Sequence, residues 1–266
     1  MVGRSGIAGL VLLAALVPAT AYAGPAASVA APTVTAAVPA SVDGAVVKRR
    51  KIGESVDGRA IMAYRLGEKG RPPVVLISTM HGNEPDTRRI LTSLKDGPRI
   101  VGVDLWVVPT YNPDGLAAGT RKNAHGVDLN RNFPYQWTDL DGNYESGPKP
   151  KSEPETRAMV RFLKRVEPRR IISFHQPLHG VDTDTKNKKF ARKVARNLKL
   201  PRKTFDCGGV CHGTMTSWYN HKFDGAALTV EYGDAPSRRM MRRTAPKRTL
   251  AVFGARRVRL QGEIVD

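Results

Sequence analysis

The sequence is short of several kinds of residue, and each shortage excludes a class of protein or site. Only two cysteines, Cys207 and Cys211, occur in 266 residues. They are too few for a cysteine-based zinc site, because His212 alone cannot supply the missing ligands. Aromatic residues make up 6% and no nucleic-acid motif is present, which argues against a nucleic-acid partner despite a formal charge of +19. Beyond the N-terminal segment, no stretch approaches the roughly 20 apolar residues that a membrane span needs.

The N-terminal segment has the pattern of a cleavable signal peptide. Arg4 is the only charge before an apolar run over residues 7–17, and Ala21-Tyr22-Ala23 follows as an A-x-A cleavage site. The run is short for a bilayer span, and an uncleaved membrane anchor is the alternative. We therefore expect residues 1–23 to be removed on export. The mature protein is then secreted, either extracellular or associated with the cell wall, without a membrane attachment.

Two further segments follow the cleavage site. Residues 24–44 consist mainly of Ala, Val, Pro, Ser and Thr, with no charge before Asp43. This composition cannot build a core and predicts a flexible leader. A short propeptide is the alternative that the sequence leaves open. Residues 45–266 have a length suited to one folded domain.

The excess of basic residues favours a polyanionic neighbour. Lys and Arg number 43 against 24 Asp and Glu, with clusters at residues 48–51, 186–203 and 238–257. For an exported protein, anionic wall polymers are the expected partner rather than nucleic acid. A surface whose charge serves only solubility is the alternative, because net charge alone is a weak functional signal.

The two cysteines are separated by Gly-Gly-Val in a chain that we expect to be exported. Oxidising compartments preserve disulfides, so a local bond between Cys207 and Cys211 is the preferred interpretation. A metal-binding pair is the alternative, although further ligands of matching spacing are missing.

Short apolar runs alternate with helical patterns along the chain. The expected strands, apolar enough for burial on both faces, are residues 74–78, 103–108, 171–174 and 227–230. The expected helices are residues 85–95, 152–166, 187–198 and 236–253. Ser152 and Glu155 form a capping-box pattern at the start of the second helix. The alternation predicts an α/β fold, a single domain with a central mixed, mainly parallel β-sheet flanked by helices.

Three reactive side chains, His81, His175 and Glu231, follow expected strands. Ligands gather at the carboxyl ends of strands in open sheets, so we expect these side chains at one edge. His81 and Glu84 are three residues apart in a turn, and His175 is a suitable third ligand for a catalytic zinc, which binds imidazole and carboxylate groups. An isolated His-x-x-Glu match would instead favour a structural role, with His81 capping a strand and Glu84 in the first turn of a helix.

Several ordered motifs accompany this pair. In chain order they are Asn112-Pro113-Asp114-Gly115, Arg121-Lys122, Asp128-Leu129-Asn130-Arg131-Asn132, Ser173-Phe174-His175-Gln176 and Thr229-Val230-Glu231-Tyr232. With them, the chain resembles the zinc carboxypeptidase family, the carboxypeptidase A-like metallopeptidases, from about Ile52 to Asp234. The resemblance implies a carboxypeptidase-like fold and a zinc peptidase catalytic domain over residues 45–266.

The resemblance also implies a metal and a catalytic base. His81, Glu84 and His175 match the ligands of one zinc ion per chain. Glu231 matches the general base, which takes a proton from water and passes it to the leaving amine. A strand-end salt bridge is the structural alternative for Glu231, and Asp234 is a weaker candidate for the base.

Three more residues match the substrate contacts of the family. Arg121 corresponds to the arginine that polarises the scissile carbonyl and stabilises the oxyanion. Asn130 and Arg131 correspond to the pair that holds a substrate carboxylate, a task suited to the guanidinium fork. The substrate-capping tyrosine of the family has no counterpart here, because neither Tyr219 nor Tyr232 aligns with it.

Two features favour one branch of the family. The interval of 94 residues between His81 and His175 is short. The sequence His175-Gln176-Pro177-Leu178 is similar to the bacterial murein-peptide amidases, which hydrolyse the γ-D-glutamyl–meso-diaminopimelate bond. A cell-wall peptide with free carboxylates is therefore the expected substrate. The signal peptide departs from intracellular members of that branch and suggests action outside the membrane.

Two other functions stay open. A secreted metallocarboxypeptidase would remove C-terminal residues from peptides or proteins. A preference of such an enzyme for basic residues would require an acid in its pocket, for which Asp182, Asp184 and Asp206 are candidates. A non-catalytic basic wall-binding protein would be marked by loss of a zinc ligand or of Glu231, and none is lost.

Overall fold

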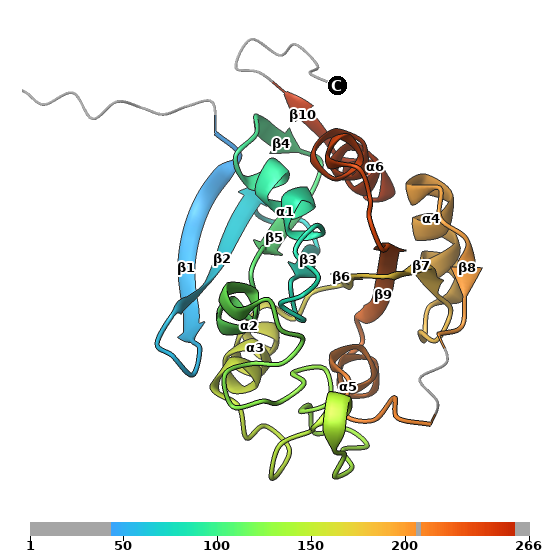
Figure 1. Cartoon of the computed structure of the whole chain (residues 1–266). Coiled ribbons are helices and arrows are strands. Elements are labelled where there is room, and N and C mark those ends of the chain that lie inside the picture. Colours follow the sequence, from blue (N-terminus) through green and yellow to red (C-terminus); the bar gives the residue numbers. More distant parts are fainter. Residues whose placement is uncertain (1–43, 206–208, 259–266) are drawn as a thin grey trace, which may run out of the picture. The chain divides into compact units, whose positions relative to one another are not determined.

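Eight strands form one mixed sheet in the part of the chain that this computed structural model describes, residues 44–205 and 209–258 (Figure 1). Their order is β1-β2-β5-β3-β6-β9-β7-β8. The bounds are β1 (Val46–Glu54), β2 (Ala60–Gly67), β3 (Pro73–Ser78), β5 (Asp104–Val108), β6 (Arg170–His175), β7 (Leu178–Asp182), β8 (Arg202–Lys203) and β9 (Ala226–Gly233). The central strands β5, β3, β6 and β9 are parallel, whereas the β1–β2, β2–β5 and β7–β9 pairs are antiparallel. The predicted mixed, mainly parallel sheet is confirmed.

The N-terminal predictions fall outside the described residues. The signal peptide, residues 1–23, lies wholly outside, and so does the leader apart from Gly44. Both boundaries stay predictions. Among the residues that the structure describes, no helix has the length and apolar character required to cross a membrane.

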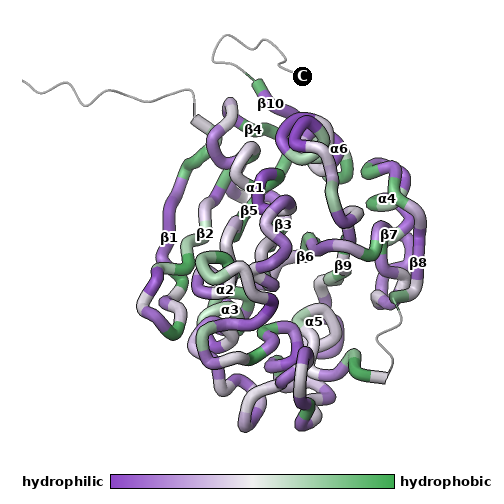
Figure 2. Tube along the Cα trace, viewed as in Figure 1, coloured by the Kyte–Doolittle hydropathy of each residue, from purple (hydrophilic) through white to green (hydrophobic). Residues whose placement is uncertain are grey.

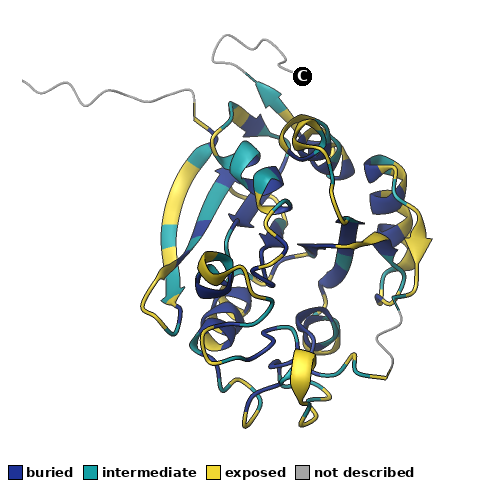
Figure 3. Ribbon diagram, in the orientation of Figure 1, coloured by how far each residue is buried: buried dark blue, intermediate teal, exposed yellow. Residues whose placement is uncertain are grey.

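The central strands are apolar on both faces because helices cover both faces. In β3, Val74 and Leu76 pack into one hydrophobic cluster, whereas Val75 and Ile77 pack into the other. The first cluster includes α1 (Arg88–Lys95), α4 (Lys188–Leu198) and α6 (Ala245–Val252), and the second includes α3 (Pro154–Val166) and α5 (Met215–Lys222). Figure 3 shows β3 and β9 in the dark blue of buried residues. Burial on two sides explains the near-continuous apolar runs of the sequence.

All four predicted strands are present, within three residues of their expected bounds. The β1–β2 hairpin at the edge of the sheet is not predicted. The middle of β1 is a hydrophilic run, residues 48–51 (Figure 2), and five of the nine residues of the strand are exposed. An edge strand has a neighbour on one side only, and charged side chains there discourage pairing with another chain. No apolar run therefore marks β1 in the sequence.

The predicted capping box at the start of α3 is wrong. The residue that precedes the helix is Glu153, which makes no side-chain cap, and Pro154 occupies the first helical turn. Ser152 Oγ instead accepts from Asn132 Nδ2 at 2.8 Å and donates to Glu153 Oε1 at 2.7 Å. Proline suits the first turn because its fixed backbone angle is helical and its missing N–H has no helical partner there.

The other helices differ less from expectation. α1 begins at Arg88 rather than at residue 85, after a turn. α4 matches its predicted range, and Asn187 caps it by accepting from the backbone N–H of Phe190 at 2.9 Å. The predicted helix over residues 236–253 contains a π-helical segment, Met240–Thr244, directly before α6. Pro246 follows that segment and lacks the N–H that a regular helical turn requires.

The turn after β3 packs directly on α2 (Pro113–Ala118). Asn112 caps this helix by accepting from the backbone N–H of Gly115 at 2.8 Å. A Cβ atom on Gly82 would overlap the carbonyl group of Gly115. The glycines of these two motifs therefore allow a close backbone approach, which fixes the turn that carries His81 and Glu84.

The substitution Gly82→Ala tests this contact. We expect the free energy of unfolding to fall by about 1–3 kcal/mol, as for other overpacked sites, because the added methyl group must displace α2 or the turn. Urea unfolding followed by circular dichroism measures the change. Gly44→Ala is the matched control, since a Cβ there meets nothing within 4 Å. Equal losses in the two variants would contradict the close approach.

Candidate active site

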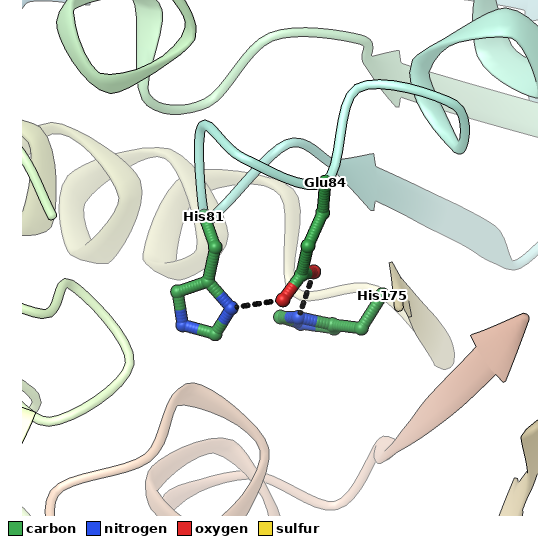
Figure 4. A group of neighbouring side chains, drawn as sticks. All are labelled: His81, Glu84 and His175. Carbon is green, nitrogen blue, oxygen red and sulfur yellow. Dashed lines mark hydrogen bonds and ion pairs between the residues drawn. The ribbon is translucent and has the colours of Figure 1, made fainter. Parts of the chain in front are cut away.

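His81, Glu84 and His175 meet at the carboxyl ends of two parallel strands. His81 and Glu84 lie in the turn after β3, and His175 ends β6, the neighbour of β3 (Figure 4). Potential ligand atoms of the three residues all lie within 4.8 Å of one another. Their exposed fractions are only 3%, 5% and 2%. Among the described residues, this is the one group of three His, Cys, Asp or Glu side chains that could hold a metal ion.

The two imidazole rings turn the same nitrogen toward the carboxylate of Glu84. Its Oε1 lies 2.7 Å from His81 Nδ1, and its Oε2 lies 3.0 Å from His175 Nδ1 (Figure 4). The outer nitrogens also have partners. His81 Nε2 lies 3.0 Å from Asp128 Oδ1, and His175 Nε2 lies 2.8 Å from Ser173 Oγ. Such outer contacts fix the orientation of each ring and leave Nδ1 facing the centre of the group.

Two buried carboxylates set the charge around His81. Burial by itself lowers the pKa of His81, but the carboxylates of Glu84 and Asp128 outweigh burial and raise that pKa to about 9. Burial raises the pKa of both carboxyls. His81 and His175 nevertheless hold the pKa of Glu84 far below its ordinary range, and His81 and Arg121 do the same for Asp128. Two buried carboxylates that stay ionised beside imidazole nitrogens favour a cation where they meet.

Asp128 holds several parts of the site together, a role that the sequence analysis does not assign. Its Oδ2 accepts from Arg121 Nε at 3.0 Å and from a terminal guanidinium nitrogen at 2.8 Å. Its Oδ1 accepts from the backbone N–H of Asn130 at 2.9 Å and faces His81. The sequence indicated Asp128 only by its place in the motif of residues 128–132. Spacing along the chain cannot show that its carboxylate contacts the imidazole of His81.

Arg121 reaches the site from the loop after α2. Its other terminal nitrogen lies 3.3 Å from His81 Nδ1 and 3.9 Å from Glu84 Oε1. The paired contact with Asp128 fixes the plane of the guanidinium. A positive charge is thereby held beside the centre of the His–Glu–His group, where a developing oxyanion could be stabilised.

Arg131 is a buried cation with one nitrogen that has no partner. Only 4% of the residue is exposed, and its Nε makes no hydrogen bond. One terminal nitrogen donates to the carbonyl of Asn130 at 2.8 Å, and the guanidinium lies over the ring of Tyr144. Burial lowers the pKa of Arg131. A desolvated guanidinium without a carboxylate partner among the described residues is suited to an anionic ligand.

Glu231 lies directly beside His175, its register partner in the parallel β6–β9 pair. It is buried, and its Oε2 accepts from the backbone N–H of Leu178 at 3.3 Å. Burial raises its pKa above the ordinary value for a glutamate. Glu231 makes no ion pair with the described Lys and Arg residues, which argues against the structural alternative of a strand-end salt bridge.

One cleft of about 570 Å³ brings the predicted residues together. All seven predicted site residues line it: His81, Glu84, Arg121, Asn130, Arg131, His175 and Glu231. They come from segments more than 100 residues apart in the sequence. The His–Glu–His group that could hold a metal, the buried carboxylate of Glu231 and the buried guanidinium of Arg131 therefore share one cavity.

A sequence profile described as zinc carboxypeptidase matches residues 40–236. The chain belongs to that family. Relatives with sequence similarity include murein peptide amidase A of Escherichia coli K12, 31% identical over 183 residues that cover 62% of this chain and 74% of the relative. Murein peptide amidase A of Vibrio campbellii is 28% identical over 196 residues, covering 67% and 77%. The chain is accordingly a zinc metallopeptidase, as the sequence analysis predicts.

Solved structures support the same fold. The crystal structure of murein-tripeptide amidase MpaA from Escherichia coli O157 is 26% identical with a TM-score of 0.65, covering 77% of this chain and 90% of that one. Carboxypeptidase A from Helicoverpa armigera gives the same TM-score at 16% identity, covering 79% and 68%. At that identity the second likeness concerns the fold alone. The carboxypeptidase-like fold is confirmed.

The family implies zinc, and the donor set fits this metal. Two imidazole nitrogens and a carboxylate leave one position of a tetrahedral zinc site open, as catalytic sites require. The rings of His81 and His175 are already oriented by Asp128 and Ser173. His81, Glu84 and His175 remain the predicted ligands of one zinc ion.

Tyr219 and Tyr232, which do not align with the substrate-capping tyrosine of the family, also lie outside the cleft. Tyr219 and Tyr232 are buried, and Tyr219 donates its hydroxyl to the carbonyl of Pro168 at 2.7 Å. Neither lines the cleft, whereas Tyr144 does, beneath the guanidinium groups of Arg121 and Arg131. Tyr144 lies in a short 3-10 turn. Its contacts with Arg121 and Arg131 are made by the tertiary fold and could not be predicted from sequence spacing.

Two other predictions concern residues near the cleft. Cys211 is disulfide-bonded, in keeping with the local staple, although its predicted partner Cys207 lies outside the described residues. Asp234, the weaker candidate for the base, does not line the cleft, and its backbone carbonyl accepts from Gln176 Nε2 at 2.9 Å. Glu231 therefore remains the predicted base.

The substitution Asp128→Asn tests the support of the metal site. The amide keeps the shape but removes the charge that orients His81, and loss of such an outer partner typically weakens metal binding about 10–100-fold. Zinc affinity is measured by competition with a chromophoric chelator. Asp224→Asn, an exposed residue before β9, is the control. Unchanged zinc affinity in Asp128→Asn would show that His81 needs no carboxylate to bind metal.

Proposed function

We propose that this zinc carboxypeptidase family member hydrolyses an amide bond in cell-wall (murein) peptides, the γ-D-glutamyl–meso-diaminopimelate bond. The observation that carries the proposal is the unpaired, buried guanidinium of Arg131 in the same cleft as the His–Glu–His group and Glu231. A substrate with a free carboxylate next to the scissile bond can bind Arg131 through that carboxylate while the scissile bond lies at the His–Glu–His group and Glu231. The murein peptide amidases among its relatives support this substrate class.

The residues divide the work according to their charges. A bound zinc ion would supply Lewis acidity to the scissile carbonyl and lower the pKa of water. Glu231, held beside His175, takes a proton from water and delivers it to the leaving nitrogen. Arg121 offsets the negative charge that develops on the carbonyl oxygen. Asn130 and Arg131 hold the substrate carboxylate and so fix the scissile bond against these groups.

Burial assists the base. Because burial raises the pKa of Glu231, its carboxylate has a higher proton affinity than an exposed glutamate. A raised pKa brings a general base closer to neutral pH, where it can both accept and release a proton during one turnover. The backbone N–H of Leu178 keeps the carboxylate in place.

The place of action follows from the predicted signal peptide. A chain exported by residues 1–23 would meet wall peptides outside the membrane. A basic surface, with 43 Lys and Arg against 24 Asp and Glu, suits anionic wall polymers as neighbours. Nucleic acid and membrane attachment after cleavage form no part of the proposal.

A secreted metallocarboxypeptidase acting on peptide or protein C-termini is the second candidate. The same carboxylate-binding groups, Asn130 and Arg131, favour it, because a protein C-terminus also carries a carboxylate beside the scissile bond. A non-catalytic wall-binding protein would not need the predicted ligands and base, and all of them line the cleft.

The deciding assay uses the zinc-loaded mature protein with L-Ala-γ-D-Glu-meso-diaminopimelate and with an N-blocked dipeptide, and identifies products by mass. We expect free diaminopimelate from the first substrate only. Glu231→Gln should bind zinc with unchanged stoichiometry while kcat falls at least 100-fold, the range for a lost general base. Cleavage of the dipeptide alone would favour the second candidate, and undiminished turnover by Glu231→Gln would remove this residue from the mechanism.

Arg131→Ala tests the recognition of the carboxylate. We expect kcat/KM to fall about 10–100-fold for a substrate with a free carboxylate at the released residue, as for a lost charged hydrogen bond. The amidated form of the same substrate should be affected much less, because it offers no charge to the guanidinium. Equal losses on the two substrates would contradict the assigned contact.

A further inference from the structure

Tyr144 contacts both arginines of the active-site cleft. The guanidinium carbon of Arg131 lies 4.9 Å from the centre of the Tyr144 ring, and that of Arg121 lies 5.4 Å from it. Both distances are within the roughly 6 Å over which a cation is attracted to an aromatic face. All three side chains line the cleft. One ring therefore joins the residue predicted to bind the substrate carboxylate to the residue predicted to stabilise the oxyanion.

The two arginines differ in what else holds them. Arg121 makes two hydrogen bonds to one carboxylate oxygen of Asp128, at 3.0 Å and 2.8 Å, and these fix the plane of its guanidinium. Arg131 has no such pair among the described residues. Its Nε makes no hydrogen bond, and one terminal nitrogen donates to the carbonyl of Asn130 at 2.8 Å. A single hydrogen bond leaves a planar guanidinium free to turn, so the Tyr144 ring is the contact that fixes the plane of Arg131.

An aromatic ring suits this position better than a second carboxylate. Burial lowers the pKa of Arg131, Asp128 opposes this effect, and the neighbouring charge of Arg121 lowers that pKa further. The electron-rich face of a ring stabilises a guanidinium that burial and a like charge destabilise. A carboxylate in the same place would pair with the guanidinium fork and exclude the substrate carboxylate. The ring therefore stabilises Arg131 and leaves it able to bind an anionic group.

The ring of Tyr144, rather than its hydroxyl, makes these contacts. Tyr144 is 37% exposed in the 3-10 turn Gly142–Tyr144, and its hydroxyl has no hydrogen-bond partner among the described residues. Phenylalanine at this position would keep the aromatic face, whereas leucine would remove it. Because the side chain is partly exposed, we expect both replacements to leave the fold intact.

We propose that Tyr144 is a positioning residue that holds the guanidinium of Arg131 in the plane that the substrate carboxylate requires. It acts on substrate binding through Arg131, since the paired contact with Asp128 keeps Arg121 in place without it. Tyr144 needs no contact of its own with the substrate. The inference rests on the proposed function, because it needs a substrate carboxylate beside the scissile bond.

The test measures kcat and KM separately on zinc-loaded protein. The substrates are L-Ala-γ-D-Glu-meso-diaminopimelate and its form amidated at the carboxylate beside the scissile bond. Tyr144→Leu should raise KM for the free carboxylate about 3–30-fold, the range for a lost cation–π contact, and keep kcat within about twofold. KM for the amidated form should not change. Tyr144→Phe should restore the wild-type KM. Tyr135→Leu, which removes a tyrosine stacked on His221 outside the cleft, is the matched control and should leave both constants unchanged.

Three results would overturn the role of Tyr144 and leave the murein substrate standing. A fall in kcat without a rise in KM in Tyr144→Leu would place the effect on the chemical step. Equal rises in KM on the two substrates would show a general change of the cleft. A loss in Tyr144→Phe as large as that in Tyr144→Leu would show that the hydroxyl, rather than the ring, is required.

A further pair of substrates separates this inference from the proposed function. If the γ-linked peptide is not cleaved, the murein substrate is overturned, and the comparison is made with benzoyl-glycyl-phenylalanine and its amide. The expected rise in KM there, confined to the free carboxylate and reversed by Tyr144→Phe, would support Tyr144. Any other pattern, or cleavage of neither pair, would overturn both.

Discussion

The parallel pairing of β3, β6 and β9 is the constraint on which the site depends. Parallel neighbours end at the same edge of the sheet, so residues after β3, at the end of β6 and near the end of β9 lie close together. His81, His175 and Glu231 occupy those positions. Helices on both faces bury the strands, which keeps their register fixed and their ends rigid. A catalytic side chain at the end of a rigid strand is already held near the geometry that the reaction requires.

The charged side chains of the cleft have different roles according to whether each has a partner of opposite charge. Asp128 and Glu84 are buried carboxylates satisfied by histidines and by Arg121, so they form the support of the metal site. Arg131 is also removed from water, and its Nε has no hydrogen-bond partner. Unpaired charges in a cleft cost stability, and a ligand of complementary charge recovers that cost on binding.

Errors in predicting the fold have local physical causes. β1 carries hydrophilic residues because it is an edge strand, so the apolar pattern that revealed β3 and β6 is missing from it. The capping box at Ser152 fits the sequence pattern, but Pro154 fixes the start of α3 and Ser152 bonds to Asn132 from a distant segment. The central strands, which are buried on both faces, were predictable, whereas the exposed edge strand and the start of α3 were not.

The sequence by itself determined the central strands, the residue types at their ends and the family. Buried strands need apolar runs, and the motifs of the family place His, Glu and Arg in a characteristic order. Only the tertiary structure decided which of these side chains touch. The contact of Asp128 with His81, the place of Tyr144 under two arginines and the position of Asp182 in the cleft join segments far apart in the chain. Spacing along a sequence holds no information on such contacts, since strand order and register set them.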